Sequence, residues 1–261
     1  MTGDDSTKHI LIDSQAGILR IQMNRPDKKN ALTRAMYRTM ADALIQADED
    51  DSVRVVLITG TEDCFCAGND LTDFRNASMP GQKHPPNPFI PALSRAKKPV
   101  VAAVTGVAIG IGTTMLLHCD LVYAGANARF HLPFVNLGLC PEFGSSVLLP
   151  LLMGHQRAAE LLLLGEPFSA ETAREVGIVN MVCPDEELLK TALEKARQLA
   201  AQPSASVRLT KALMKRGRDL AVTAAIEEEA GHFSKRLSSP EAREAFQAFA
   251  ERRKPDFSRF P

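Results

Sequence analysis

The sequence of 261 residues carries no excess of charge of either sign. Thirty-one Lys and Arg residues balance thirty-one Asp and Glu residues, so the formal net charge at neutral pH is zero. Electrostatic binding to nucleic acid or to an anionic membrane usually needs a basic surplus. We therefore expect neither as a partner. The 45% hydrophobic and 24% charged residues are typical of an ordinary globular protein.

Cysteine is scarce, and its spacing fits no metal site. The five cysteines, at positions 64, 66, 119, 140 and 183, cannot all pair and include no C-x-x-C. This pattern argues against a disulfide framework and against a zinc site, so we expect no metal. The first residues also lack the basic start and apolar run of a signal peptide. Together these absences predict a cytoplasmic protein.

Several motifs that define large enzyme classes are missing. The sequence has no G-x-x-x-x-G-K-[ST], no G-x-S-x-G and no H-E-x-x-H. Gly110-x-Gly112 follows a predicted strand, but Met115 stands where a dinucleotide-binding turn needs a small residue. The sequence also offers no convincing membrane span. The uncharged stretch 99–118 is interrupted by glycine and threonine, and predicts a buried strand, a turn and a buried helix.

The hydrophobic pattern predicts an α/β core over residues 1–200. Alternating apolar residues predict a β-hairpin around the turn at 15–17, and Thr33 is a good cap for a helix that reaches Ala47. Buried strands are expected at 53–58, 99–104 and 120–124, and a buried helix at 113–119. Five prolines within 75–91 predict a loop, which is a candidate lid.

The last third of the sequence predicts helices. Their expected ranges are 144–152, 155–164, 169–176, 185–201, 204–216, 220–237 and 240–253. We interpret residues 201–261 as a helical extension that binds a second copy of the chain, with packing on its own core as the alternative.

Two glycine-rich turns directly follow predicted strands. One contains Gly60 and residues 65–71 (FCAGNDL), and the other covers residues 106–112 (GVAIGIG). Glycine lets the backbone bend sharply there and leaves N–H groups free to meet an acceptor. Each turn alone is also compatible with an ordinary strand-to-helix connection. Two converging N–H groups would form an oxyanion hole.

These turns carry a resemblance to a known family. The segments FCAGNDL at 65–71, KPVVAAVTGVAIGIG at 98–112 and CDLVYA at 119–124 resemble the crotonase, or enoyl-CoA hydratase/isomerase, superfamily. The similarity extends from about Lys8 to Arg253. It implies a spiral of ββα repeats, C-terminal helices used in a homotrimer or hexamer, and an acyl-CoA substrate. Coenzyme A would enter as part of the substrate, so no separate cofactor is expected.

The resemblance also assigns catalytic positions. It gives the oxyanion donors as the backbone N–H groups of Asn69 and Ile111. The two glutamates of the family's hydratases fall at Thr114 and Phe134, neither of which can act as a carboxylate base. Glu142 matches the single glutamate base of the delta-3,delta-2-enoyl-CoA isomerase branch, and its apolar neighbours predict a raised pKa. On its own, a glutamate there could equally stabilise the start of helix 144–152.

The substrate-binding positions follow from the same resemblance. Coenzyme A and its acyl chain are expected to contact Arg25, Lys29, Ala31, Ala67, Gly68, Asn69, Asp70, Leu71, Gly110 and Phe134. For Lys28 or Lys29, solvation at the surface is an equally open interpretation. Lys211, Lys215 and the basic cluster 252–254 are further candidates for the CoA phosphates. Asp70 is expected to orient the first turn, and Cys66 and Cys140 to be buried thiols.

These assignments predict an enzyme of fatty acid β-oxidation. It would move the double bond of a 3-enoyl-CoA to give the 2-trans-enoyl-CoA. Two alternatives stay open. One is hydration or thioester hydrolysis that uses Glu142, Asp70 or Asp73, and the other is an acyl-CoA-binding protein without catalysis.

Overall fold

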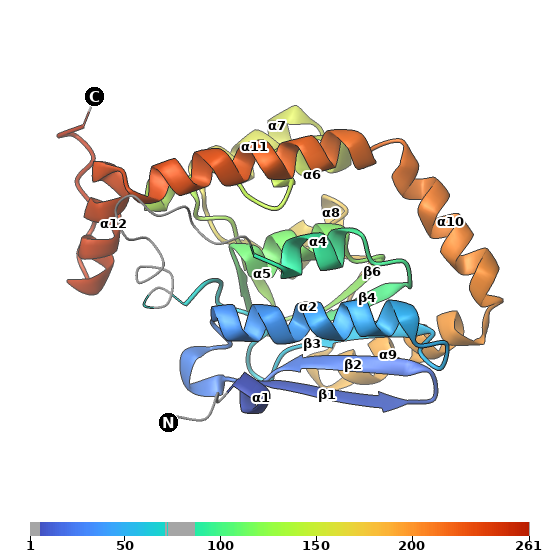
Figure 1. Cartoon of the computed structure of the whole chain (residues 1–261). Helices are drawn as coiled ribbons and strands as arrows, with labels where there is room; N and C mark the ends of the chain where they lie inside the picture. The colour runs from blue at the N-terminus through green and yellow to red at the C-terminus, as the bar shows by residue number, and fades with distance from the viewer. Residues whose placement is uncertain (1–5, 71, 73–86, 261) are drawn as a thin grey trace, which may run out of the picture.

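A six-stranded sheet lies at the centre of the protein (Figure 1). The computed structural model describes residues 6–70, 72 and 87–260. The strands follow the order β1 (Ile10–Gln15), β2 (Ile18–Met23), β3 (Val55–Thr59), β4 (Val100–Val104), β6 (Leu121–Gly125) and β9 (Met181–Cys183). β1 and β2 form the predicted antiparallel hairpin, and every later pair is parallel.

A second, smaller sheet is built from the short strands that alternate with those of the first sheet along the chain. It contains β5 (Val107–Ile109), β7 (Arg129–His131) and β8 (Phe168–Ser169). Cys66 extends it through a parallel bridge to Ala108. A long strand followed by a short extended segment therefore occurs three times: β3 then Cys66, β4 then β5, and β6 then β7. This is the α/β spiral that the resemblance implies.

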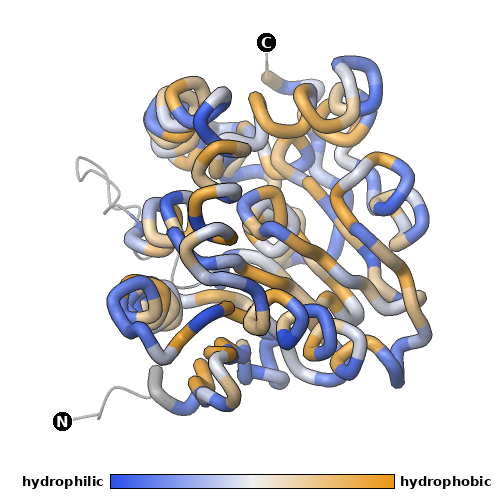
Figure 2. Tube along the Cα trace, turned by 90° about the vertical axis from the view of Figure 1, so that its right-hand side faces the viewer, coloured by the Kyte–Doolittle hydropathy of each residue, from blue (hydrophilic) through white to orange (hydrophobic). Residues whose placement is uncertain are grey.

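The central strands β3 and β4 are buried along their whole length, which explains their uninterrupted apolar sequence, whereas the edge strand β1 is largely exposed. On β3, Val56 and Ile58 face the larger core beneath α2 (Arg34–Glu49). Val55 and Leu57 face the opposite layer, against α9 (Leu188–Ala201). Figure 2 shows the interior strands mainly in the hydrophobic colour, while the outer helices alternate between both colours, as expected for elements with one face in water.

Short helices connect these layers. They are α1 (Ser6–His9), η1 (Pro26–Lys28), α4 (Phe89–Ser94), α5 (Ile111–Thr114), η2 (Met115–His118), η3 (Val135–Leu137), α6 (Ser145–Met153), α7 (His155–Ala159), the π-helical η4 (Glu160–Leu164), α8 (Ala170–Glu175) and η5 (Asp185–Glu187). The stretch 99–118 forms β4, β5, α5 and η2. No helix in the described parts of the chain is both long and apolar enough to span a bilayer.

Two predicted boundaries in this region are wrong. The loop expected over 75–91 ends before α4, which begins at Phe89, because Pro88 occupies the N-cap and Pro91 the first turn, where proline is tolerated. Residues 75–86 of the candidate lid lie outside the described residues. The helix expected from Thr113 begins at Ile111, because Gly110 turns the chain directly into it.

The C-terminal helices are α10 (Ser204–Arg216), α11 (Asp219–Leu237) and α12 (Pro240–Ala250). α11 runs along α6 at the top of Figure 1, and α12 packs against η3. Helix α12 ends three residues earlier than the sequence predicts, because Arg252 adopts a left-handed conformation with φ +55°.

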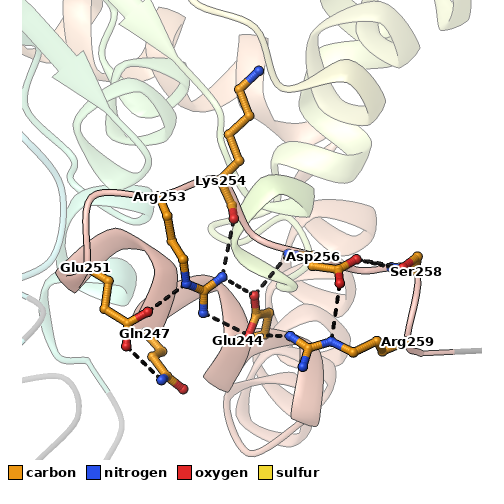
Figure 3. Close-up of polar contacts among 8 residues, drawn as sticks. All are labelled: Glu244, Gln247, Glu251, Arg253, Lys254, Asp256, Ser258 and Arg259. Atoms are coloured by element: carbon orange, nitrogen blue, oxygen red, sulfur yellow. Dashed lines mark hydrogen bonds and ion pairs between the residues drawn. The ribbon is translucent and has the colours of Figure 1, made fainter.

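Glu244 holds the tail that follows α12 (Figure 3). Its buried carboxylate pairs with Arg253 at 2.5 Å and with Arg259 at 3.2 Å, and accepts the N–H of Asp256 at 2.9 Å. The hydrogen bond from Arg253 is the largest cause that lowers the pKa of Glu244 to about 2. The carboxylate is thus ionised at neutral pH, and anchors the tail by charge-assisted hydrogen bonds.

We predict that Glu244→Gln loosens this tail without unfolding the core. Loss of the charge should speed amide hydrogen exchange in residues 252–260 by about tenfold or more, while exchange in the central sheet stays unchanged. Mass spectrometry of exchanged peptides measures both regions. The exposed Glu194→Gln is the control, and unchanged tail exchange in Glu244→Gln would refute the anchoring role.

Candidate active site

Asn30 fixes the loop of residues 24–32 on the first glycine turn. Its side chain is fully buried and its backbone is left-handed, with φ +56°. The side-chain Nδ2 donates to the carbonyl oxygens of Cys64 at 2.7 Å and Phe65 at 3.1 Å, while Oδ1 accepts the N–H of Arg25 at 2.7 Å. Asparagine tolerates this backbone better than most residues. The site is therefore built on a satisfied polar group deep in the core.

The two predicted glycine turns lie against each other. Cys66 donates its N–H to the carbonyl of Val107 and accepts the N–H of Ile109, both at 2.9 Å. A Cβ atom at Gly112 would lie 2.6 Å from the carbonyl oxygen of Cys66. Glycine is therefore required by the close approach of two backbones.

Each turn presents one unpaired backbone donor. Leu32 donates to Gly68 at 2.8 Å and accepts from Asp70 at 2.9 Å in a parallel bridge, so the N–H of Asn69 faces away from this pair. Ile111 is the first residue of α5, where an N–H has no partner inside the helix. Within the described chain, neither N–H meets a hydrogen-bond acceptor.

Open space adjoins the second donor. Gly110 has φ +55° and ψ −118°, a conformation that is essentially restricted to glycine. Among the residues that the structure describes, and apart from its two chain neighbours, a Cβ atom built there would meet no atom within 4 Å. Conformation rather than crowding thus demands glycine at this position, and the space beside it is available to a ligand.

The side chain of Asn69 is also held in place. The Tyr37 hydroxyl donates to Asn69 Oδ1 at 2.6 Å, and the Tyr37 ring packs on Phe89 with centroids 5.9 Å apart. Helix α2 therefore orients the residue that carries the first donor.

Glu142 reaches the same helix that carries the second donor. Its side chain is buried, and Oε1 accepts a hydrogen bond of 2.5 Å from the hydroxyl of Thr114, three residues after Ile111 on α5. Burial is the largest cause that raises the pKa of Glu142 to about 8; the Thr114 hydrogen bond lowers this pKa and the charge of Glu229 raises it. A carboxyl with such a pKa can exchange protons near neutral pH.

The turn after Glu142 is strained and firmly packed. Phe143 has φ +62° although it is not glycine, and Gly144 follows with φ +73°. The Phe143 ring stacks on His118 at 4.2 Å and meets Phe89 edge-on at 6.2 Å. Burial lowers the pKa of His118 to about 3, so the neutral ring donates from Nε2 to the Phe143 carbonyl at 2.7 Å. This packing fixes the direction in which the Glu142 side chain projects from the backbone.

Glu229 is the charged group that acts on Glu142, whereas Phe134, Cys66 and Cys140 are apolar or neutral. Phe134 is 4% exposed and belongs to the same apolar cluster as Ile111 and Phe143. Burial raises the pKa of Cys66 to about 12 and also raises the pKa of Cys140. The raised pKa values make both thiols poor nucleophiles; Cys66 is buried as the sequence predicts, whereas Cys140 is only partly buried.

The structure brings several predicted binding residues together around the first turn. Arg25 pairs with Asp70 at 2.7 Å and also donates to the carbonyl of Ala31 at 3.0 Å. Lys29 has an exposed side chain, while its carbonyl accepts the N–H of Ala67 at 2.9 Å. Arg25 and Asp70 thus support the loop, and their contact with substrate stays a prediction. Leu71 lies outside the described residues.

Three of the other basic candidates, Lys211, Lys215 and Arg253, have partners within the chain. Lys211 is 4% exposed and donates to Asp120 at 2.6 Å, and Lys215 donates to the Ser94 carbonyl at 2.8 Å. Arg253 is bound by Glu244. The contacts of Lys211 and Lys215 tie α10 to the rest of the chain, whereas the Arg253 pair lies within the C-terminal region.

Sequence reasoning missed four residues that shape this site: Asn30, Tyr37, His118 and Glu229. An asparagine in a polar loop hints at a left-handed backbone, but not at its partners. The remaining three contact residues that are 25 to 85 positions away in the sequence, a separation that no local pattern reveals.

Comparison with known proteins identifies the same family over nearly the full length. The family model for enoyl-CoA hydratase/isomerase matches residues 13–259. The chain is 36% identical over 257 residues to 1,2-epoxyphenylacetyl-CoA isomerase of Escherichia coli, covering 95% of this chain and 98% of that one. It is 37% identical over 254 residues to enoyl-CoA delta isomerase 2 of Rattus norvegicus, covering 95% of this chain but only 64% of that longer protein. Relatives also include a hydratase, the 2,3-dehydroadipyl-CoA hydratase of E. coli.

The fold agrees with solved structures of the family. OdaA of Pseudomonas aeruginosa superposes with a TM-score of 0.89 and 49% identity, covering 93% of this chain and 98% of that one. The family match thus covers almost every described residue. The glycine-turn site, the two sheets and the C-terminal helices agree with it. The chain belongs to the crotonase, or enoyl-CoA hydratase/isomerase, superfamily of acyl-CoA enzymes.

Proposed function

We propose that this protein moves the double bond of a 3-enoyl-CoA from C3 to C2, with Glu142 as its single base. The hydrogen bond between Glu142 and Thr114 carries this proposal, because it places one carboxyl beside the helix that begins with the Ile111 N–H. One relative, enoyl-CoA delta isomerase 2 of Rattus norvegicus, is named for an isomerisation of this kind, which supports the proposal.

The reaction needs one carboxylate and two donors. Glu142 removes a proton from C2, and the electron pair shifts through the carbonyl to give a dienolate. The N–H groups of Asn69 and Ile111 bind the oxygen as its negative charge grows; each such donor typically contributes about 3–4 kcal/mol. Glu142 then returns the proton to C4, which leaves the double bond between C2 and C3. No water is consumed.

Water addition is less well supported by the residues present. The positions that correspond to the two glutamates of family hydratases hold Thr114 and Phe134. Threonine here donates to Glu142 instead of serving as a second carboxylate, and Phe134 is buried among apolar side chains. With a single carboxyl, proton transfer from one carbon to another is the simpler reaction.

Replacement of the base should remove the activity but not the binding. We predict that Glu142→Gln lowers kcat for 3-enoyl-CoA by about 10²–10⁴-fold, because the amide cannot take a proton. Absorbance of the conjugated thioester reports isomerisation, and calorimetry with a CoA thioester reports binding. The exposed Glu166→Gln is the charge-matched control. Full activity in Glu142→Gln, or hydration of a 2-enoyl-CoA by the wild type at comparable rates, would contradict the proposal.

The activity should rise with pH and level off above the pKa of Glu142. This pKa lies at about 8, so kcat/KM should increase up to that region as the carboxyl ionises. Thr114→Val removes a hydrogen bond that lowers this pKa, and should move the midpoint to higher pH. Thr114→Ser keeps the hydroxyl and should keep the wild-type midpoint. Identical pH profiles for these two variants would show that the hydroxyl does not act on the base.

We further propose that the chain assembles into a homotrimer or hexamer. Large apolar side chains are exposed on α6 and η4 (Leu151, Leu163, Leu164) and on α10 (Leu209, Leu213, Met214), each more than half accessible. Clusters of this kind are characteristic of interfaces. The first set lies in the predicted core region 1–200 and the second in the predicted oligomerisation region 201–261. The five free thiols accord with the cytoplasmic location that we also propose.

Sedimentation equilibrium measures the assembly directly. We expect three or six times the chain mass of 28.4 kDa. Leu163→Asp should shift the protein toward smaller species, because a charge buried in an apolar interface is costly. A monomeric wild type would refute this proposal and leave the catalytic one untouched.

A further inference from the structure

A carboxylate from the C-terminal helix α11 lies against the segment that carries Glu142. Glu229 is 7% exposed, and its two oxygens accept hydrogen bonds from Gly144 N–H at 2.6 Å, Ser146 N–H at 2.9 Å and the Ser146 hydroxyl at 2.5 Å. Gly144 and Ser146 follow Glu142 by two and four residues. Neither the family motifs nor the reaction requires this contact.

The segment that Glu229 holds depends on support from outside. Consecutive left-handed residues, Phe143 and Gly144, turn the chain between Glu142 and α6. A non-glycine residue in this conformation costs free energy and persists only where its surroundings hold it. His118 binds the Phe143 carbonyl on one side, and Glu229 binds the N–H groups of Gly144 and Ser146 on the other.

Further contacts join α11 to the same segment. Arg236 donates to the carbonyl of Gly138 at 2.9 Å, and Val222 and Ile226 side chains approach Gly144. Residues from more than one turn of helix α11 therefore contact the segment after Glu142. Among the polar contacts of α11, those of Glu229 lie closest to Glu142 in the sequence.

We propose that Glu229 is a positioning residue for Glu142, which fixes the turn that carries the base and places a negative charge behind it. This inference rests on the proposed role of Glu142 as the base. It gives the C-terminal extension a part in the active site of its own chain, in addition to any part in assembly.

The charges around Glu142 support an electrostatic effect. The charge of Glu229 raises the pKa of Glu142, in the same direction as burial and against the Thr114 hydrogen bond. Cys66, Cys140 and His118 are neutral at pH 7, because burial raises the pKa of both thiols and lowers that of the imidazole. Arg236 is engaged with Glu241 at 3.0 Å. Loss of the charge on Glu229 should thus lower the pKa of Glu142.

The test compares Glu229→Gln with Glu227→Gln, an equal charge change at an exposed site on the same helix. Two quantities are measured: the pH midpoint of kcat/KM for 3-enoyl-CoA, and the titration of the Glu142 carboxyl itself by infrared difference spectroscopy against Glu142→Gln. In Glu229→Gln both midpoints should fall by about 0.5–1 pH unit, and in Glu227→Gln neither should move.

The outcomes separate this inference from the proposed function. If the midpoint of the Glu142 carboxyl titration falls but the kinetic midpoint stays, Glu229 acts on Glu142 as inferred. The role of Glu142 as the base is then wrong. If the activity of Glu229→Gln falls while the midpoint of the Glu142 carboxyl titration stays unchanged, Glu229 is merely structural and the inference is overturned.

A second variant keeps the test valid if Glu229→Gln folds poorly. Glu229→Asp retains the charge but shortens the side chain, so kcat should fall while the titration of Glu142 stays close to that of the wild type. A lowered Glu142 titration in this variant would contradict a charge effect.

Discussion

The hydrogen bond from Thr114 to Glu142 joins the two halves of the site. Thr114 belongs to α5, which begins with the Ile111 donor, and Glu142 belongs to the strained turn before α6. Without this contact, the base and the donor would be set by separate elements. With it, one short helix fixes the carboxyl relative to the Ile111 N–H, and in the proposed reaction such preorganisation would give electrostatic stabilisation its catalytic value.

Close backbone contacts and buried polar side chains together hold this arrangement. The two glycine turns touch through Cys66, so the two N–H donors sit on one rigid unit rather than on two flexible loops. Asn30 completes that unit from the N-terminal loop, and Tyr37 orients Asn69 from α2. On the opposite side, His118 and Glu229 hold the turn after Glu142. The site thus draws on elements from the whole length of the chain.

The local parts of this molecule were predictable, and the distant pairings were not. Uninterrupted apolar runs predicted the buried strands that became β3 and β4, and Ser169 and Thr33 marked helix starts that the structure confirms. The short strands β5, β8 and β9 were missed, since two or three residues give too little alternation to recognise. The start of α4 and the end of α12 were misplaced, because Pro88 takes the N-cap position of α4 and Arg252 adopts a left-handed conformation after α12. Asn69, Ile111 and Glu142 came from the family resemblance, whereas Glu229 became visible only through its contacts in space.

The fate of the proton that leaves C2 tests the central claim most directly. A 3-enoyl-CoA that carries deuterium at C2 is converted by the wild-type protein, and the 2-enoyl-CoA product is analysed by mass spectrometry and NMR. If Glu142 alone moves the proton within an apolar pocket, a measurable share of the deuterium will appear at C4. If C4 receives hydrogen only from the solvent, the deuteron taken from C2 is lost before reprotonation, and the claim that Glu142 carries it to C4 within a closed apolar pocket is wrong.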